Sequence, residues 1–311
     1  MTEFKISAGA GHDWLQRKGY PTGDQLEPVT STQQYDGGGQ YGVEIPVINS
    51  YRELERVAAF LDEAAISVTR YNETHGSILL SDAELKDMFA LCRDRREGIL
   101  ISLGPRPEYD IKSTFYRTQF GLEMGRQINN FDAFRACVEE AVRLTELGCR
   151  GIIVYDLGVT RVLSEMRAEG ALPSDLILKT SSHCMATNPF LAKIFEENGA
   201  DSITTAHDLA LPVLQETRRL CPDLPLDVPI DVYRTKGGFL RFYEAAEILQ
   251  VAAPLMLKIG ASAQSHPYDS VGESTTRERV ARVARTLEML DRYLPDRTRI
   301  SEKSKHNCVP A

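Results

Sequence analysis

The sequence predicts a single (β/α)8 barrel, in which eight parallel strands alternate with helices. From residue 43 onward, short aliphatic runs alternate with longer helical patterns eight times, which favours a parallel sheet built from repeated strand–helix units. Several helical stretches end at a glycine that leads into the next strand, as at Gly148, Gly170 and Gly199; glycine adopts the left-handed cap conformation readily. The length of 311 residues suits one barrel.

The predicted strands are short and apolar, and each leads into a polar or glycine-containing loop. In chain order they are residues 43–48, 67–71, 99–103, 151–155, 176–180, 202–205, 226–232 and 255–259. Between them apolar residues recur every three or four positions, as in Leu54, Val57, Ala58 and Leu61. That spacing is typical of helices with one buried face, and we expect these faces to cover the outside of the strands.

Three stretches interrupt the repeat and set the predicted organisation. Residues 1–42 form an N-terminal extension, and residues 43–294 form the barrel. We expect the extension to lie over one end of the barrel. Residues 295–311 form a C-terminal tail, which is polar from residue 301 and expected to be mobile. The connection 104–130, after the third strand, is long for a compact domain. Its aromatic residues, Tyr109, Phe115, Tyr116 and Phe120, favour a lid over the strand ends.

Composition narrows the classes of partner. Hydrophobic residues make up 42% and charged residues 26% of the chain, with a net charge of -8, so a large core is expected and a nucleic-acid partner is not. No apolar run approaches the roughly 18 residues that span a bilayer, and no signal-peptide pattern begins the sequence. We therefore expect a cytoplasmic protein without a membrane partner. The sequence leaves a homo-oligomer open.

Sequence motifs also restrict the cofactors. The six cysteines contain no C-x-x-C pair, which disfavours an iron–sulfur cluster or a zinc ribbon. Neither a glycine-rich dinucleotide fingerprint nor a phosphate-binding loop is present, so no nucleotide cofactor is expected. The G-x-S-x-G pattern of serine hydrolases is absent as well.

Charged residues inside apolar strands predict where the chemistry lies. In barrels of this type the catalytic groups stand at the carboxyl ends of the strands, and a charged side chain cannot face the apolar helix layer. Lys179 and Lys258 should therefore point toward the barrel axis, near Asp156 and Asp231. One interpretation is a structural ion-pair network. The other makes either lysine a general base or Schiff-base nucleophile, with the aspartates moving protons.

A second constellation suggests a divalent metal. Two histidines and two aspartates follow four adjacent predicted strands, and imidazole and carboxylate ligands suit a transition metal. These candidate ligands are Asp156, His183, His207 and Asp231.

Arginine residues near the same strand ends suggest an anionic substrate, since guanidinium groups bind carboxylate and phosphate well. The predicted substrate-binding residues are Arg70, Arg106, Arg234, Arg241 and His207. Arg117 belongs to the same group by position.

Segments of the second half resemble the peptidase family U32, barrel proteins often labelled collagenase-like peptidases. The resemblance rests on residues 151–158, 176–180, 188–189, 199–201, 207–211 and 237–244. It implies a hydrolase label. Members are also tied to hydroxylation of RNA bases and quinone precursors with a four-cysteine iron–sulfur cluster. After His207 this chain has only Cys221 and Cys308, so it departs from that cluster set.

These observations lead to three functional hypotheses. The first is an enzyme that acts on a small polar, anionic substrate by acid–base or Schiff-base chemistry of the lyase or aldolase type. The second is a metal-assisted hydrolase, as a peptidase or amidase. The third is a binding or partner subunit without catalytic activity.

Overall fold

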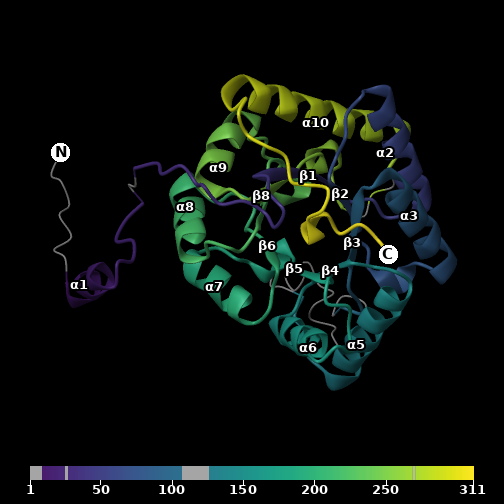
Figure 1. Cartoon of the computed structure of the whole chain (residues 1–311), viewed down its shortest axis with the longest axis horizontal. Coiled ribbons are helices and arrows are strands. Elements are labelled where there is room, and N and C mark those ends of the chain that lie inside the picture. Colours follow the sequence, from purple (N-terminus) through teal and green to yellow (C-terminus); the bar gives the residue numbers. More distant parts are fainter. Residues whose placement is uncertain (1–8, 25–26, 107–125, 268, 270) are drawn as a thin grey trace.

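The computed structural model describes residues 9–24, 27–106, 126–267, 269 and 271–311. It confirms the predicted fold: eight parallel strands close into a barrel in the order β1 to β8, with β8 paired to β1, and helices surround it (Figure 1). The strands are β1 (Tyr41–Pro46), β2 (Arg70–Asn72), β3 (Gly98–Ser102), β4 (Gly151–Val154), β5 (Ile177–Thr180), β6 (Ser202–Thr204), β7 (Leu226–Pro229) and β8 (Leu255–Lys258).

Apart from the first, the helices pack their apolar faces against the outside of this barrel. Within the described residues they are α1 (Ala10–Arg17), α2 (Tyr51–Glu63), α3 (Asp82–Arg95), α5 (Phe131–Glu146), α6 (Leu157–Ala168), α7 (Pro189–Glu197), α8 (Leu211–Leu220), α9 (Ala245–Ala252) and α10 (Glu273–Tyr293). In α2, for example, the predicted residues Leu54, Val57, Ala58 and Leu61 are buried. None of the described helices is long and apolar enough to cross a membrane.

Register places alternate strand residues inside the barrel. Glu44 on β1 lies opposite Arg70 on β2 and Lys258 on β8, and all three side chains turn inward, whereas Val43 and Ile45 join the core beneath the helices. Toward β3, β4 and β5 the interior is instead filled by apolar side chains, including Leu100, Ile153 and Ile177. The barrel interior is therefore charged on one side and apolar on the other.

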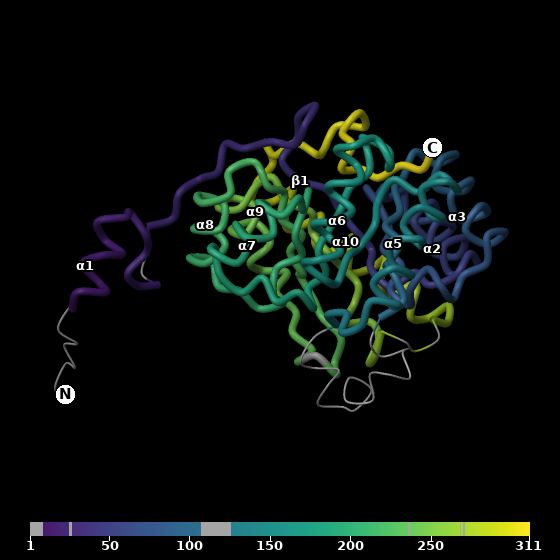
Figure 2. Tube along the Cα trace, turned by 90° about the horizontal axis from the view of Figure 1, so that it is seen from below, coloured from purple at the N-terminus to yellow at the C-terminus, as the bar shows by residue number. Residues whose placement is uncertain are grey.

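The described part of the N-terminal extension includes a helix and a segment that packs on the barrel. It contains α1, which stands away from the barrel in Figures 1 and 2. Residues 27–40 return to the barrel, where Ser31 N donates to Gln250 O at 2.7 Å and Ser301 N donates to Gly38 O at 3.0 Å. This part of the extension lies at the end where the strands begin.

The C-terminal tail is packed against the barrel, in contrast to the mobile tail expected from its polarity. His306 and Cys308 are buried, Ile99 N donates to Cys308 O at 3.2 Å, and Ala311 N donates to Gly148 O at 2.9 Å. A side chain at Gly98 would overlap the tail backbone, so glycine at the start of β3 permits this approach. The tail thereby closes the end opposite the strand-end loops (Figure 2).

Candidate functional site

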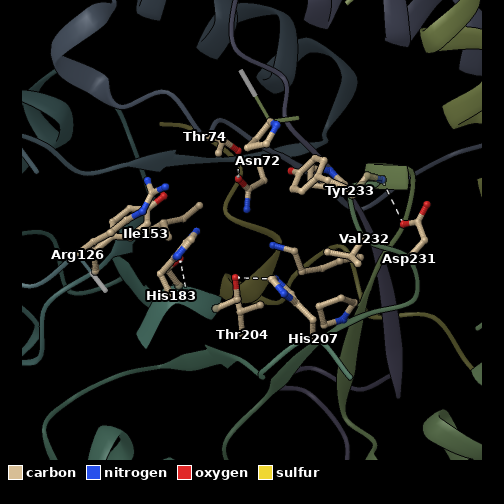
Figure 3. A pocket seen from close by; sticks show the side chains of 18 of the residues that line it. Asn72, Thr74, Arg126, Ile153, His183, Thr204, His207, Asp231, Val232 and Tyr233 are labelled. Atoms are coloured by element: carbon tan, nitrogen blue, oxygen red, sulfur yellow. Dashed lines mark hydrogen bonds between the residues drawn. The ribbon is translucent and has the colours of Figure 1, made fainter. Parts of the chain in front are cut away.

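A cavity lined by many polar residues opens at the carboxyl ends of the strands, where sequence reasoning placed the chemistry. It has a volume of about 210 Å³, and its lining residues come from the ends of all eight strands and the loops that follow them. Figure 3 shows these side chains. The polar lining residues are Asn72, Thr74, Arg126, Tyr155, Ser181, Ser182, His183, Thr204, His207, Asp231, Tyr233, Lys258 and His266.

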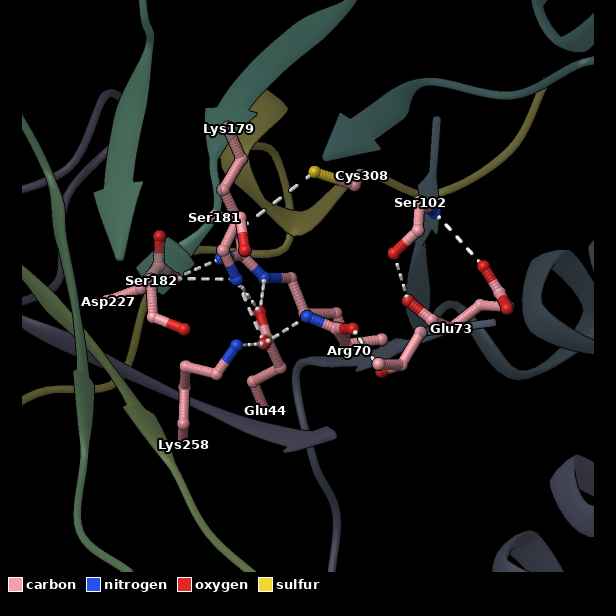
Figure 4. A network of polar contacts seen from close by, with 12 residues as sticks. Glu44, Arg70, Glu73, Ser102, Lys179, Ser181, Ser182, Asp227, Lys258 and Cys308 are labelled. Carbon is pink, nitrogen blue, oxygen red and sulfur yellow. Dashed lines mark hydrogen bonds and ion pairs between the residues drawn. The ribbon is translucent and has the colours of Figure 1, made fainter. Parts of the chain in front are cut away.

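A buried ion cluster lies beneath this cavity, and Glu44 is at its centre (Figure 4). The Lys179 Nζ lies 2.9 Å and 2.7 Å from the two Glu44 carboxylate oxygens. Arg70 Nε donates to Glu44 Oε2 at 2.7 Å, and Lys258 Nζ lies 2.9 Å from Glu44 Oε1. Asp227 pairs with Arg70 and lies 3.5 Å from Lys179. We call these five residues the ion cluster.

The charges in the ion cluster do not balance. Its three cations, Arg70, Lys179 and Lys258, face only two carboxylates, Glu44 and Asp227. One positive charge is therefore in excess in a site with little solvent, where Coulomb interactions are stronger than in water. An anion bound in the cavity above would remove this excess.

Burial and the neighbouring charges shift two pKa values in the cluster. Burial alone would raise the pKa of Glu44, but Lys179, Lys258 and Arg70 outweigh it and hold the pKa well below its usual value. For Lys179 the reverse holds, because burial lowers its pKa to about 8 despite the attraction of Asp227 and Glu44. Glu44 therefore stays ionised, and Lys179 is the member that binds its proton weakly.

The two predicted lysines occupy different environments. Lys258 lines the cavity and its side chain is 14% exposed, whereas Lys179 is fully buried against Glu44 and is absent from the cavity lining. Lys258 and Asp231 thus open on one cavity as expected, but Lys179 does not. Lys258 shares the lining with Asn72, Ile153 and Thr204 of the alternate strands β2, β4 and β6, whereas Lys179 on β5 contacts Glu44 and Asp227 on β1 and β7.

Both predicted aspartates hold backbone amides. Asp231 accepts hydrogen bonds from three successive N–H groups, those of Gly260, Ala261 and Ser262, at 2.8 to 3.1 Å. Asp156 caps α6 by accepting from Val159 N at 3.0 Å, and it also accepts from Ile128 N. Asp156 does not line the cavity. Burial raises the pKa of Asp231 although these hydrogen bonds lower it.

The four candidate metal ligands, Asp156, His183, His207 and Asp231, are not brought together. Among the residues that the structure describes, no three His, Cys, Asp or Glu side chains form a group that could hold a metal ion. The two aspartates direct their oxygens at helix and turn starts, while the two histidines line the cavity. This donor set does not fit a divalent metal.

The predicted substrate-binding arginines mostly have other partners. Arg70 belongs to the ion cluster, and Arg106 donates to two backbone carbonyls while it stacks 4.7 Å from the centre of the Tyr155 ring. Arg241 pairs with a carboxylate one helical turn away and donates to a loop carbonyl. Arg234 is exposed on a 3-10 turn. None of these four lines the cavity.

His207, the fifth predicted substrate-binding residue, does line the cavity (Figure 3). Its Nε2 lies 3.1 Å from the hydroxyl of Ser182. His183 lies on the same side, with its ring 6.2 Å from that of Tyr155. A serine hydroxyl beside an imidazole can relay a proton or act as a nucleophile.

Sequence reasoning missed several residues that shape the site. Glu44 carried a usable signal, because it is a charged residue between Val43 and Ile45 in a predicted strand. Arg126 and Tyr155 line the cavity, but no sequence pattern distinguishes them from other loop or strand-end residues. Arg117 and most of the predicted lid, residues 107–125, lie outside the described residues.

No protein-family model and no curated protein sequence matches this chain. Among solved structures, the U32 peptidase Mk0906 is 17% identical over 84% of this chain and 90% of that chain, with a TM-score of 0.41. The YdjI aldolase from Escherichia coli K12 is 13% identical over 83% of this chain and 92% of that chain, with a TM-score of 0.47.

The orotidine 5'-monophosphate decarboxylase from Methanocaldococcus jannaschii, in complex with the inhibitor BMP, is 10% identical over 78% of this chain and 98% of that chain, with a TM-score of 0.45. Identities and scores this low assign neither a family nor a reaction. Barrel and cavity together define the class of this protein, an enzyme-like (β/α)8 barrel with a cavity at the strand ends.

Proposed function

We propose that this chain is a barrel enzyme of the lyase or aldolase type, which binds a small carboxylate-bearing carbonyl compound and condenses it with Lys258. One observation carries the proposal: Lys258 is the cavity-lining member of a buried cluster with one cation in excess. A substrate carboxylate supplies the missing negative charge, and the amine lies where a carbonyl carbon could reach it.

The chemistry conserves the charge of the cluster. The Lys258 ammonium gives a proton to a base, and its nitrogen attacks the carbonyl carbon. The carbinolamine then loses water and becomes a protonated imine. Because the imine carries the same charge as the original ammonium, Glu44, 2.9 Å from Lys258, stabilises the product as it stabilised the reactant. His207 and Ser182 line the same cavity and serve as the proton-transferring pair.

Reductive trapping tests this proposal. The protein is incubated with pyruvate and sodium borohydride, which adds hydride to an imine and leaves a stable secondary amine. Mass spectrometry of the digested protein is expected to locate the added mass on Lys258. The Lys258→Met variant should show no adduct, whereas Lys303→Met, on the opposite end of the barrel, should be labelled as the parent protein is. Absence of an adduct at Lys258 across a panel of 2-oxo acids would overturn the Schiff-base proposal.

Hydrolysis of an amide or ester is the second candidate, and the 3.1 Å contact between Ser182 Oγ and His207 Nε2 favours it. A serine activated by an adjacent imidazole is a common nucleophile, and a hydrolase label is also what the resemblance to the peptidase family U32 implies. A fluorophosphonate probe should label Ser182 if this candidate holds, and labelling should disappear in His207→Ala.

Four statements stay predictions from the sequence. They are membership of the U32 family, location in the cytoplasm, the lack of a nucleic-acid or membrane partner, and assembly as a homo-oligomer. A purely binding role also stays open to the trapping and labelling experiments, because a partner subunit would yield neither adduct.

A further inference from the structure

An apolar groove lies beside the cavity at the same end of the barrel. Its volume is about 750 Å³, and its walls include large hydrophobic side chains that face solvent: Met185, Leu240 and Tyr243 are 51%, 46% and 68% exposed. Leu211 and Phe239 also line it. We call these five residues the apolar groove. Clustered exposed hydrophobic side chains of this kind commonly mark a binding surface.

The apolar groove adjoins the cavity. His207 lines both, and Met185 directly ends the 3-10 turn Ser182–Cys184, whose first residues line the cavity. On the other wall, Leu240 pairs through its backbone with Asp231, another cavity residue. The two walls of the groove therefore adjoin cavity residues, and we infer a path past His207 for a molecule that extends from the cavity into the groove.

The polar groups of the groove favour an uncharged occupant. Arg241 and Glu244 pair with each other, with Arg241 Nε 2.8 Å from the carboxylate, and a second Arg241 nitrogen donates to Leu209 O. Asp208 lines the groove as an exposed carboxylate and would repel a second anionic group. The side chains left to contact a ligand are mainly Met185, Leu240 and Tyr243, whose thioether, alkyl and ring surfaces suit an alkyl chain.

We propose that the apolar groove binds an alkyl chain attached to the carboxylate-bearing head in the cavity, so that the substrate is a medium-chain 2-oxo acid. This inference rests on the proposed function for the position of the head. The groove sets which alkyl chain the substrate carries. The contribution of the groove to binding affinity is separate from the reaction at Lys258.

Calorimetric affinities for two ligand series test the inference. The first series is pyruvate, 2-oxohexanoate and 2-oxooctanoate, and the second is acetate, hexanoate and octanoate, which lack the reactive carbonyl. Affinity in both series is expected to rise between about twofold and fourfold for each added methylene, since one side of the chain stays open to water. In the double variant Leu240→Ser and Tyr243→Ser this rise should disappear, while affinity for pyruvate stays the same.

A matched control separates the groove from a general loss of surface hydrophobicity. Tyr293 is 58% exposed at the end of α10, so Tyr293→Ser should leave the chain-length dependence unchanged. Equal affinities along both series would overturn the proposal that the groove binds an alkyl chain. A rise in affinity with chain length that survives in the double variant would overturn it as well. Failure of the Schiff base alone would look different, because the acid series would still show the rise while borohydride trapped nothing.

Discussion

Replacing each lysine of the ion cluster by methionine separates its structural member from its functional one. Methionine keeps most of the side-chain volume and removes the charge, so the two variants differ mainly in the contacts they lose. Lys179→Met removes an ammonium that lies 2.7 and 2.9 Å from Glu44 and 3.5 Å from Asp227 at full burial. Lys258→Met removes one contact of 2.9 Å at the cavity floor.

Breaking a buried ion pair by removing one partner destabilises a protein by about 3 to 5 kcal/mol. Burial already opposes the charged form of Lys179 and lowers its pKa to about 8. We therefore expect Lys179→Met to lower the free energy of unfolding by about 3 kcal/mol, the low end of that range. For a chain of 311 residues this is a fall in Tm of about 5 °C. Lys258→Met removes a single contact of a partly exposed side chain, so its Tm should hold.

Thermal unfolding of both variants, measured beside pyruvate binding and borohydride trapping, checks this expectation. Lys258→Met should lose binding and trapping with its stability intact. Folded Lys179→Met should still be trapped at Lys258. An equal loss of Tm in the two variants would refute the assignment, as would trapping that persists in Lys258→Met.

The remaining predictions concern the cap, the tail and pH. Asp156→Ala should lower stability by about 1 kcal/mol through loss of the α6 cap. Asp156→Ser should restore stability, and neither variant should change trapping. Loss of trapping in the serine variant would contradict a capping role. Gly98→Ala should lower stability by about 1 to 3 kcal/mol because its side chain meets the tail backbone. Gly272→Ala, which has open space around it, should be nearly neutral. Similar Tm values for the two variants would argue against the docked tail. Burial lowers the pKa of His306 to about 4, below its unfolded value near 6.5. Between these two pH values the unfolded chain binds more protons than the folded one. Stability therefore falls as the pH decreases from about 6.5 to 4. In His306→Phe, denaturant unfolding should show a shallower loss over that window, and an unchanged slope would exclude His306 as its source.

Local patterns in the sequence predicted the barrel because they repeat. The helix faces recur at three- and four-residue spacing, and Leu54, Val57 and Leu61 are buried as that spacing requires. The polar tail shows the limit of the same reasoning. His306 and Cys308 are buried because strands that begin with glycine leave room for the tail backbone, and that fit involves residues about 200 positions apart.

The candidate site was predicted in part for a similar reason. Alternation along a strand places Lys179 and Lys258 inside the barrel, and the same rule applied to Glu44 would have indicated their common partner. Which of the inward side chains reach the cavity is a different matter, because only the structure shows that Lys179 is buried against Glu44 and Asp227 while Lys258 lines the cavity.

The sequence by itself determined the repeated unit, the buried faces and the strand end at which polar residues gather, since each depends on neighbours within a few positions. Tertiary structure decided the partners. Asp156 and Asp231 hold helix and turn starts, Lys258 faces the cavity, and the tail closes the opposite end. The physical reason is that a carboxylate or an ammonium binds whichever buried group the closed barrel places within about 3 Å, and barrel closure joins β1 to β8 across the whole chain.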